Sequence, residues 1–84
     1  MNELFTAVEA KNHVAELRKG LNGVYNLDLY KLLDNMDAMV TDLSKLEVKH
    51  RRNNKAGSLM KQREKITQAI DYFNKMLLMY KLMY

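Results

Sequence analysis

The sequence has 84 residues, with no cysteine, no proline, three glycines, 48% hydrophobic residues and a net charge of +4. A chain this short forms one domain, and the lack of cysteine excludes disulfides, a thiolate nucleophile and a cysteine-based zinc site. A core of this size supplies only about 3–5 kcal/mol by itself, so we expect partner subunits to add stability.

The first predicted helix covers about residues 2–20, from a cap at Asn2 to a stop near Gly20. Lys11 and Asn12 interrupt its apolar side, so we expect it to be the least firmly packed helix. That apolar side consists of Leu4, Phe5, Val8, Val14, Leu17 and Leu21.

The second predicted helix covers about residues 27–50 and follows a turn at Asn22-Gly23 and a cap at Asn26. Its apolar residues recur at steps of four and three, as they do on one face of a helix. They are Leu29, Leu33, Met36, Val40 and Leu43, and the face is widened by Leu32, Met39 and Leu46.

The third predicted helix covers about residues 58–84, after a basic loop at 51–57, and Ser58 is its expected cap. Arg63 is the one charged position on its heptad-like seam, and we expect its long side chain to reach water. The apolar seam positions are Leu59, Ile66, Ile70, Phe73, Leu77, Tyr80 and Tyr84.

These elements predict an all-α fold, an antiparallel helical hairpin of 27–50 and 58–84 with an additional N-terminal helix. We expect this three-helix protomer, a single domain over 1–84, to assemble into an oligomeric bundle. The first residues lack the basic flank and apolar run of a secretory signal, and the most apolar stretch is too short to cross a membrane. We therefore expect a cytoplasmic protein without a membrane span.

The end of the third helix is the first candidate site. Between Met76 and Tyr84 only Lys81 is charged, so apolar side chains surround the helix axis, and a single neighbouring helix cannot cover them all. We predict a protein interface there, either with further copies of the chain or with another protein. Its residues are Phe73, Met76, Leu77, Leu78, Met79, Tyr80, Leu82, Met83 and Tyr84.

The second candidate site is a basic segment. Residues 1–48 have a net charge of −3, residues 49–65 of +6 and residues 66–84 of +1. The segment lies beside a predicted helix N-terminus, which also attracts anions, so it can bind nucleic acid or a nucleotide, or be a solvated loop. The basic residues are Lys49, Arg51, Arg52, Lys55, Lys61, Arg63 and Lys65.

Catalytic and metal-binding patterns are weak. His13 and His50 lie on different predicted segments, so a metal site would need the tertiary fold to bring them together, and Ser44 and Ser58 have no histidine placed to activate them. We therefore expect no cofactor, no metal and no enzymatic activity. A small helical enzyme with an Arg- and Glu-lined pocket between subunits is retained as an alternative.

Residues 57–80, from Gly57-Ser58-Leu59-Met60-Lys61-Gln62-Arg63-Glu64-Lys65-Ile66 to Tyr80, loosely resemble the second helix of the small hairpin co-chaperones of type III secretion. The resemblance covers barely a third of the chain, and the chain departs from that pattern in its extra N-terminal helix. The leading hypothesis is a non-enzymatic adaptor, chaperone or inhibitor-type regulator that binds protein. The alternatives are an anion-binding protein and the small helical enzyme.

Overall fold

The computed structural model describes residues 5–53 and 56–83, and it is all-helical there, with no β-strand in those ranges. The helices are α1 (Ala7–Lys19), α2 (Leu27–Lys49) and α3 (Gly57–Met83). The predicted all-α class is therefore confirmed. The molecule is an elongated rod with extents of 47 × 17 × 16 Å.

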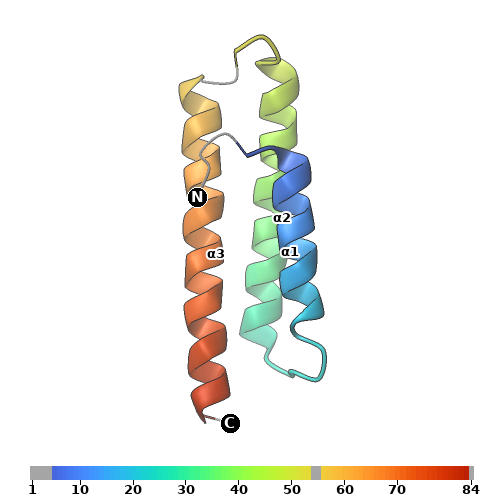
Figure 1. Ribbon diagram of the computed structural model, residues 1–84, viewed down its shortest axis with the longest axis vertical. Helices are drawn as coiled ribbons and strands as arrows, with labels where there is room; N and C mark the ends of the chain where they lie inside the picture. Colours follow the sequence, from blue (N-terminus) through green and yellow to red (C-terminus); the bar gives the residue numbers. More distant parts are fainter. Residues whose placement is uncertain (1–4, 54–55, 84) are drawn as a thin grey trace.

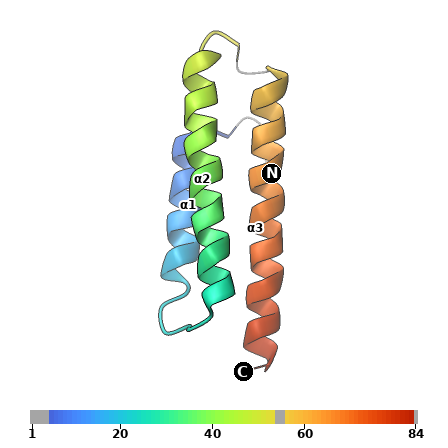
Figure 2. The ribbon, with the colours of Figure 1, turned by 180° about the vertical axis from the view of Figure 1, so that it is seen from behind.

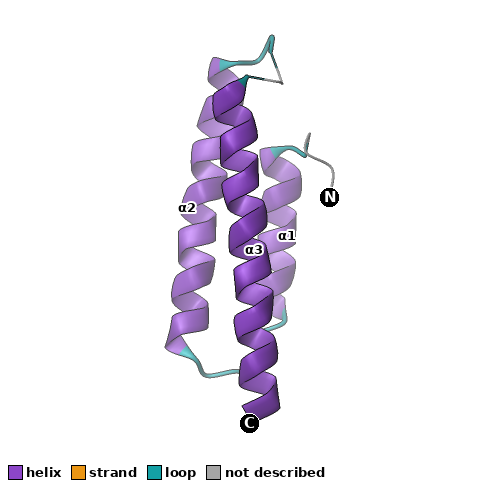
Figure 3. Cartoon of the chain, turned by 90° about the vertical axis from the view of Figure 1, so that its left-hand side faces the viewer, coloured by secondary structure: helices purple, strands orange, loops and turns teal. Residues whose placement is uncertain are grey.

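The helices lie nearly parallel to the long axis of the rod (Figure 1). α2 and α3 lie side by side and run in opposite directions, while α1 packs mainly on α2 (Figures 1 and 3). α3 extends beyond the turn that joins α1 to α2, so its last residues lie at one end of the rod (Figures 1 and 2). This overhang decides which apolar side chains remain in water.

α1 begins at Ala7, later than the predicted start near residue 2, and the predicted cap Asn2 lies outside the described residues. Thr6 is the actual N-cap: its side chain accepts a hydrogen bond from the Glu9 N–H, and Glu9 accepts one from the Thr6 N–H. This reciprocal capping box satisfies donors that the first turn would otherwise leave unpaired. The helix ends at Lys19, before Gly20, as predicted.

The apolar side of α1 differs from the predicted one. Val8 is 68% exposed, whereas Ala7 and Ala10 are buried and Val14 is 1% exposed. Small side chains therefore form much of the contact with α2, since Ala7, Ala10 and Val14 lie at helical steps of three and four. The prediction for Val8 was wrong because alanines were not counted as core residues.

α2 follows the prediction closely. The side chain of Asn26 accepts hydrogen bonds from the N–H groups of Asp28 and Leu29, at 3.0 and 3.3 Å, and caps the helix as predicted. The turn before it contains Gly23, whose φ of 82° suits glycine. The predicted core stripe is buried throughout, and its residues are Leu29, Leu33, Met36, Val40 and Leu43.

α3 begins at Gly57, so Ser58 is the second residue of the helix and not its cap. Its Oγ lies 3.2 Å from His50 Nε2, so the expectation that no histidine lies near Ser58 was wrong. Arg63 was expected to reach water, but it is only 4% exposed, and its Nε donates a 2.7 Å hydrogen bond to the Phe5 carbonyl. The chain segment before α1 therefore covers this seam position. The buried apolar seam residues of α3 are Leu59, Ile66, Ile70 and Phe73.

Candidate protein-interaction surface

The last two turns of α3 carry apolar side chains that no other part of the described chain covers fully. Leu78 and Met79 are 59% and 57% exposed, and Leu82 and Met83 are 78% and 72% exposed. We call residues 76–83 the α3 tip. Within it, Met76, Leu77 and Tyr80 are half-buried against the core.

Two predicted interface residues fall outside this exposed surface. Phe73 is 0% exposed and belongs to the core, so no partner can reach its side chain in the folded protomer. Tyr84 lies outside the described residues. The exposed surface therefore begins after Phe73, where α3 extends beyond its neighbours.

The α1–α2 turn adds apolar side chains at the same end of the rod. Tyr25 is 91% exposed and Leu27 is 68% exposed, and the turn lies at the end where α3 finishes (Figure 1). The sequence analysis missed both residues. The signal was a pair of large apolar residues on either side of the Asn26 cap, outside the stripe that α2 buries.

The opposite end of the rod is basic. Lys49, Arg51 and Arg52 are exposed, as are Lys61 and Lys65 in the first turns of α3. The ion pairs of the described residues join Arg18 to Asp34 and Asp37, and Lys19 to Glu16, so they involve none of these five side chains. We call the five residues the basic end.

Two further members of the predicted basic set are not part of this surface. Arg63 points into the protein and donates to the Phe5 carbonyl, so its guanidinium cannot meet a ligand at the surface. Lys55 lies outside the described residues. The basic end is thus smaller than the sequence suggested.

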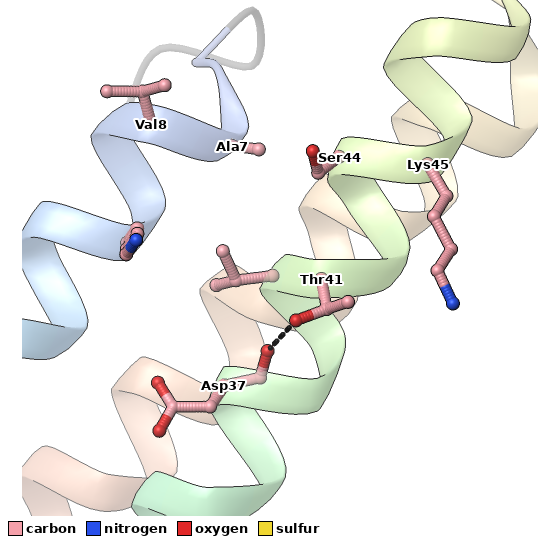
Figure 4. A pocket seen from close by; sticks show the side chains of 8 residues that line it. Ala7, Val8, Asp37, Thr41, Ser44 and Lys45 are labelled. Carbon is pink, nitrogen blue, oxygen red and sulfur yellow. Dashed lines mark hydrogen bonds between the residues drawn. The ribbon is translucent and has the colours of Figure 1, made fainter.

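A shallow groove runs between α1 and α2 (Figure 4). The Asp37 carbonyl accepts a 3.0 Å hydrogen bond from Thr41 Oγ1, and the Asp37 carboxylate accepts one from Arg18. Figure 4 shows the Lys45 side chain pointing away from α1. Of these two contacts, the one between Arg18 and Asp37 joins α1 to α2, whereas the one between Thr41 and Asp37 lies within α2. The groove is lined by Ala7, Val8, Lys11, Asp37, Val40, Thr41, Ser44 and Lys45.

The described residues contain no cluster of three His, Asp or Glu side chains that could hold a metal ion. Nor does the structure, over the ranges it describes, contain a helix with the length and hydropathy of a membrane span. Comparisons with protein families, with curated proteins and with solved structures find no match for this chain.

Proposed function

We propose that this chain is a non-enzymatic protein–protein interaction module, an adaptor, chaperone or inhibitor-type regulator, that acts as an oligomeric helical bundle. In this proposal α2 and α3 form the hairpin of each protomer, and the α3 tip contacts a further copy or another protein. The observation that carries it is the exposure of Leu78, Met79, Leu82 and Met83, each by more than half.

The free energy of burying these side chains supports the proposal. Fully burying one Leu or Met side chain is worth about 1.5–3 kcal/mol, so four exposed residues in two turns leave a large driving force unused. Contiguous apolar patches of this kind mark interaction sites on soluble proteins. Methionine adapts its shape to different neighbours, which suits a surface that binds a partner.

The arrangement of the four side chains indicates more than one contact. Leu78 and Leu82 are four residues apart and lie on one side of α3, and Met79 and Met83 lie on the adjacent side. The half-buried Leu77 and Tyr80 already pack toward the core. A partner must therefore cover a broad sector of the helix, as a neighbouring subunit in a bundle does.

The oligomeric state at tens of micromolar tests the proposal by size-exclusion chromatography with light scattering. We expect the wild-type chain to elute with at least twice the 9.9 kDa mass of one chain. Replacing Leu78 and Met79 by Lys should shift it toward the monomer, because two charges would have to be buried at the contact.

A matched control replaces two other exposed apolar residues, Val8 and Val48, which are 68% and 63% exposed and lie away from the tip. The Val8→Lys/Val48→Lys variant should keep the wild-type mass. A wild-type chain that stays monomeric and captures no partner through the tip would remove the proposal.

A second candidate function is anion binding by the basic end. The observation that favours it is five exposed Lys and Arg side chains near one end of the rod that take no part in the ion pairs of the described residues. Phosphate-bearing ligands such as nucleic acid or a nucleotide fit this chemistry.

A further inference from the structure

One face of the α2–α3 pair is left open by α1. On α2, Asp37, Thr41 and Ser44 line the groove with α1 (Figure 4). In an α-helix, side chains two positions apart point in directions that differ by about 160°. The residues two positions from those that line the groove therefore lie on the opposite side of α2. That side carries a row of half-buried residues spaced by seven, Leu32, Met39 and Leu46.

α3 carries a matching row beside it. Gln62 Nε2 donates a 2.9 Å hydrogen bond to the Met39 carbonyl, so the row that starts at Gln62 borders the Met39 row. The same seven-residue spacing continues to Ala69, Met76 and Met83. Figure 2 shows α2 and α3 with α1 beside α2 and partly behind it. We call these two apolar rows the open face. It consists of Leu32, Met39, Leu46, Ala69, Met76 and Met83.

We propose that a second copy of this chain occupies the open face, with the two rods side by side and pointing in the same direction. A two-fold axis parallel to the helices then places α2 of each chain on α3 of the other. This inference rests on the proposed function, because it adds a contact along the sides of the rods to the contact that the α3 tip makes in the oligomer.

Charge complementarity selects this arrangement. The outer row of α2, four residues before each apolar position, is Asp28, Asn35 and Asp42, all exposed. On α3, the exposed Lys61 and Lys65 flank the open face. The Gln62–Met39 bond sets the register, so Asp42 lies near the level of Lys61 along the rod. With both rods pointing the same way, Asp42 of one chain meets Lys61 of the other, and Asn35 lies near the level of Lys65. Asp28 lies about 21 Å further along α2 and takes no part in this contact.

The opposite orientation brings like charges together. A two-fold axis perpendicular to the helices stacks α2 on the α2 of the second chain, so the row of Asp28 and Asp42 faces its own copy. Like charges juxtaposed at an interface cost affinity and suppress the wrong register. This opposite orientation would also place the apolar Met79 of one chain against the lysine-bearing end of α3 in the other chain.

The size of the rod allows a stable dimer. One whole side of it measures 47 by 17 Å, which leaves room for the about 800 Å² that each partner of a standard interface buries. The same-direction arrangement also places both α3 tips at one end. The dimer would thereby present one larger apolar surface to any further protein.

A charge exchange tests the inference by analytical ultracentrifugation. Variant A is Asn35→Lys/Asp42→Lys and variant B is Lys61→Glu/Lys65→Glu. We expect each variant alone to dissociate with a dimer Kd raised about tenfold or more, since its interface holds two sets of like charges. Mixing A with B should restore the dimer, because both contacts then join opposite charges.

A matched control and a fold check separate misfolding from loss of contact. Lys11→Glu/Lys19→Glu reverses two exposed lysines of α1 and should leave the Kd unchanged. Each variant should retain the helical circular dichroism of the wild type. If A and B remain monomeric when mixed, or dimerise as well as the wild type separately, the inference is wrong. In that case, loss of the oligomer in the Leu78→Lys/Met79→Lys variant would still support the proposed function, because it would show that the α3 tip forms the contact without the open face.

Cross-linking tests the direction of the rods independently. The chain has no cysteine, so Met83→Cys provides a single thiol where the tip meets the open face, and a short bismaleimide reaches far less than the 47 Å length of the rod. We expect Met83→Cys to cross-link to itself, while a mixture of Met83→Cys and Arg52→Cys chains gives no mixed product. Mixed cross-links without tip-to-tip cross-links would overturn the same-direction arrangement.

Discussion

Two charged side chains hold the start of α1 in place. Arg63 of α3 donates to the Phe5 carbonyl at 2.7 Å, and Glu47 of α2 accepts the Ala7 N–H at 2.8 Å. The Glu47 carboxylate also lies at the positive end of the α1 dipole. Each long helix therefore supplies one polar contact to the same turn of backbone, where the apolar face of α1 is narrow.

Replacing Arg63 by Met tests the contribution of the buried guanidinium. Methionine keeps much of the apolar stem but leaves the Phe5 carbonyl without this donor, so we expect a loss of about 1–3 kcal/mol in the free energy of unfolding. Urea denaturation measures it. The control Lys75→Met changes an exposed residue further along α3 and should stay within about 0.5 kcal/mol of the wild type. Equal stability of both variants would contradict this role of Arg63.

At the scale of elements, α1 is the helix that depends most on its neighbours. It has 13 residues, fewer than the 23 of α2 and the 27 of α3, and helices shorter than about 12–15 residues are marginal in isolation. Its core contribution consists of Ala7, Ala10 and Val14. Caps and tertiary contacts therefore decide whether α1 forms.

Removing the N-cap should loosen α1 before the rest of the protein. Thr6→Ala deletes the acceptor for the Glu9 N–H and should destabilise the helix by about 1 kcal/mol. Native-state hydrogen exchange should show faster exchange of the α1 amides, with α2 and α3 changed less. Thr41→Ala is the control, since its hydroxyl bonds only the Asp37 carbonyl one turn earlier in α2. Uniform acceleration in all helices would contradict a separable α1.

At the scale of the whole molecule, the rod has chemically different ends. Exposed apolar side chains lie at the end where α3 extends beyond the α1–α2 turn, and exposed Lys and Arg residues lie around the α2–α3 connection. A net charge of +4 is thus concentrated at the end remote from the proposed protein contact. The two surfaces can act independently, because the rod separates them by much of its 47 Å length.

Polyanion binding tests the basic end. If it contacts phosphates, Arg51→Ala/Arg52→Ala should weaken binding to DNA or RNA and reduce the slope of log K against log salt by about 2. Fluorescence anisotropy over a salt series measures both quantities. Lys11→Ala/Lys45→Ala removes the same charge elsewhere and should have a smaller effect. Absence of binding at low salt would leave the basic end as a solvated surface.

The sequence alone determined the class and the main elements. The helical spacing of Leu29, Leu33, Met36, Val40 and Leu43 identified the buried side of α2, because a long regular apolar stripe leaves water only when that side of the helix faces the core. Asn26 and Gly20 marked helix ends because capping depends only on residues next to the cap in the sequence. The apolar composition of the α3 tip likewise led us to expect side chains that the protomer could not cover.

Only the tertiary structure decided which neighbours the remaining residues meet. Arg63 is buried because the chain before α1 crosses it, and Val8 is exposed because α1 turns its alanines toward α2. Tyr25 and Leu27 join the apolar end because the turn that carries them lies beside the end of α3. Such contacts depend on the packing of segments that are distant in the sequence. Periodicity within one helix predicts only the side of the helix on which a residue lies, and not the segment that it contacts there.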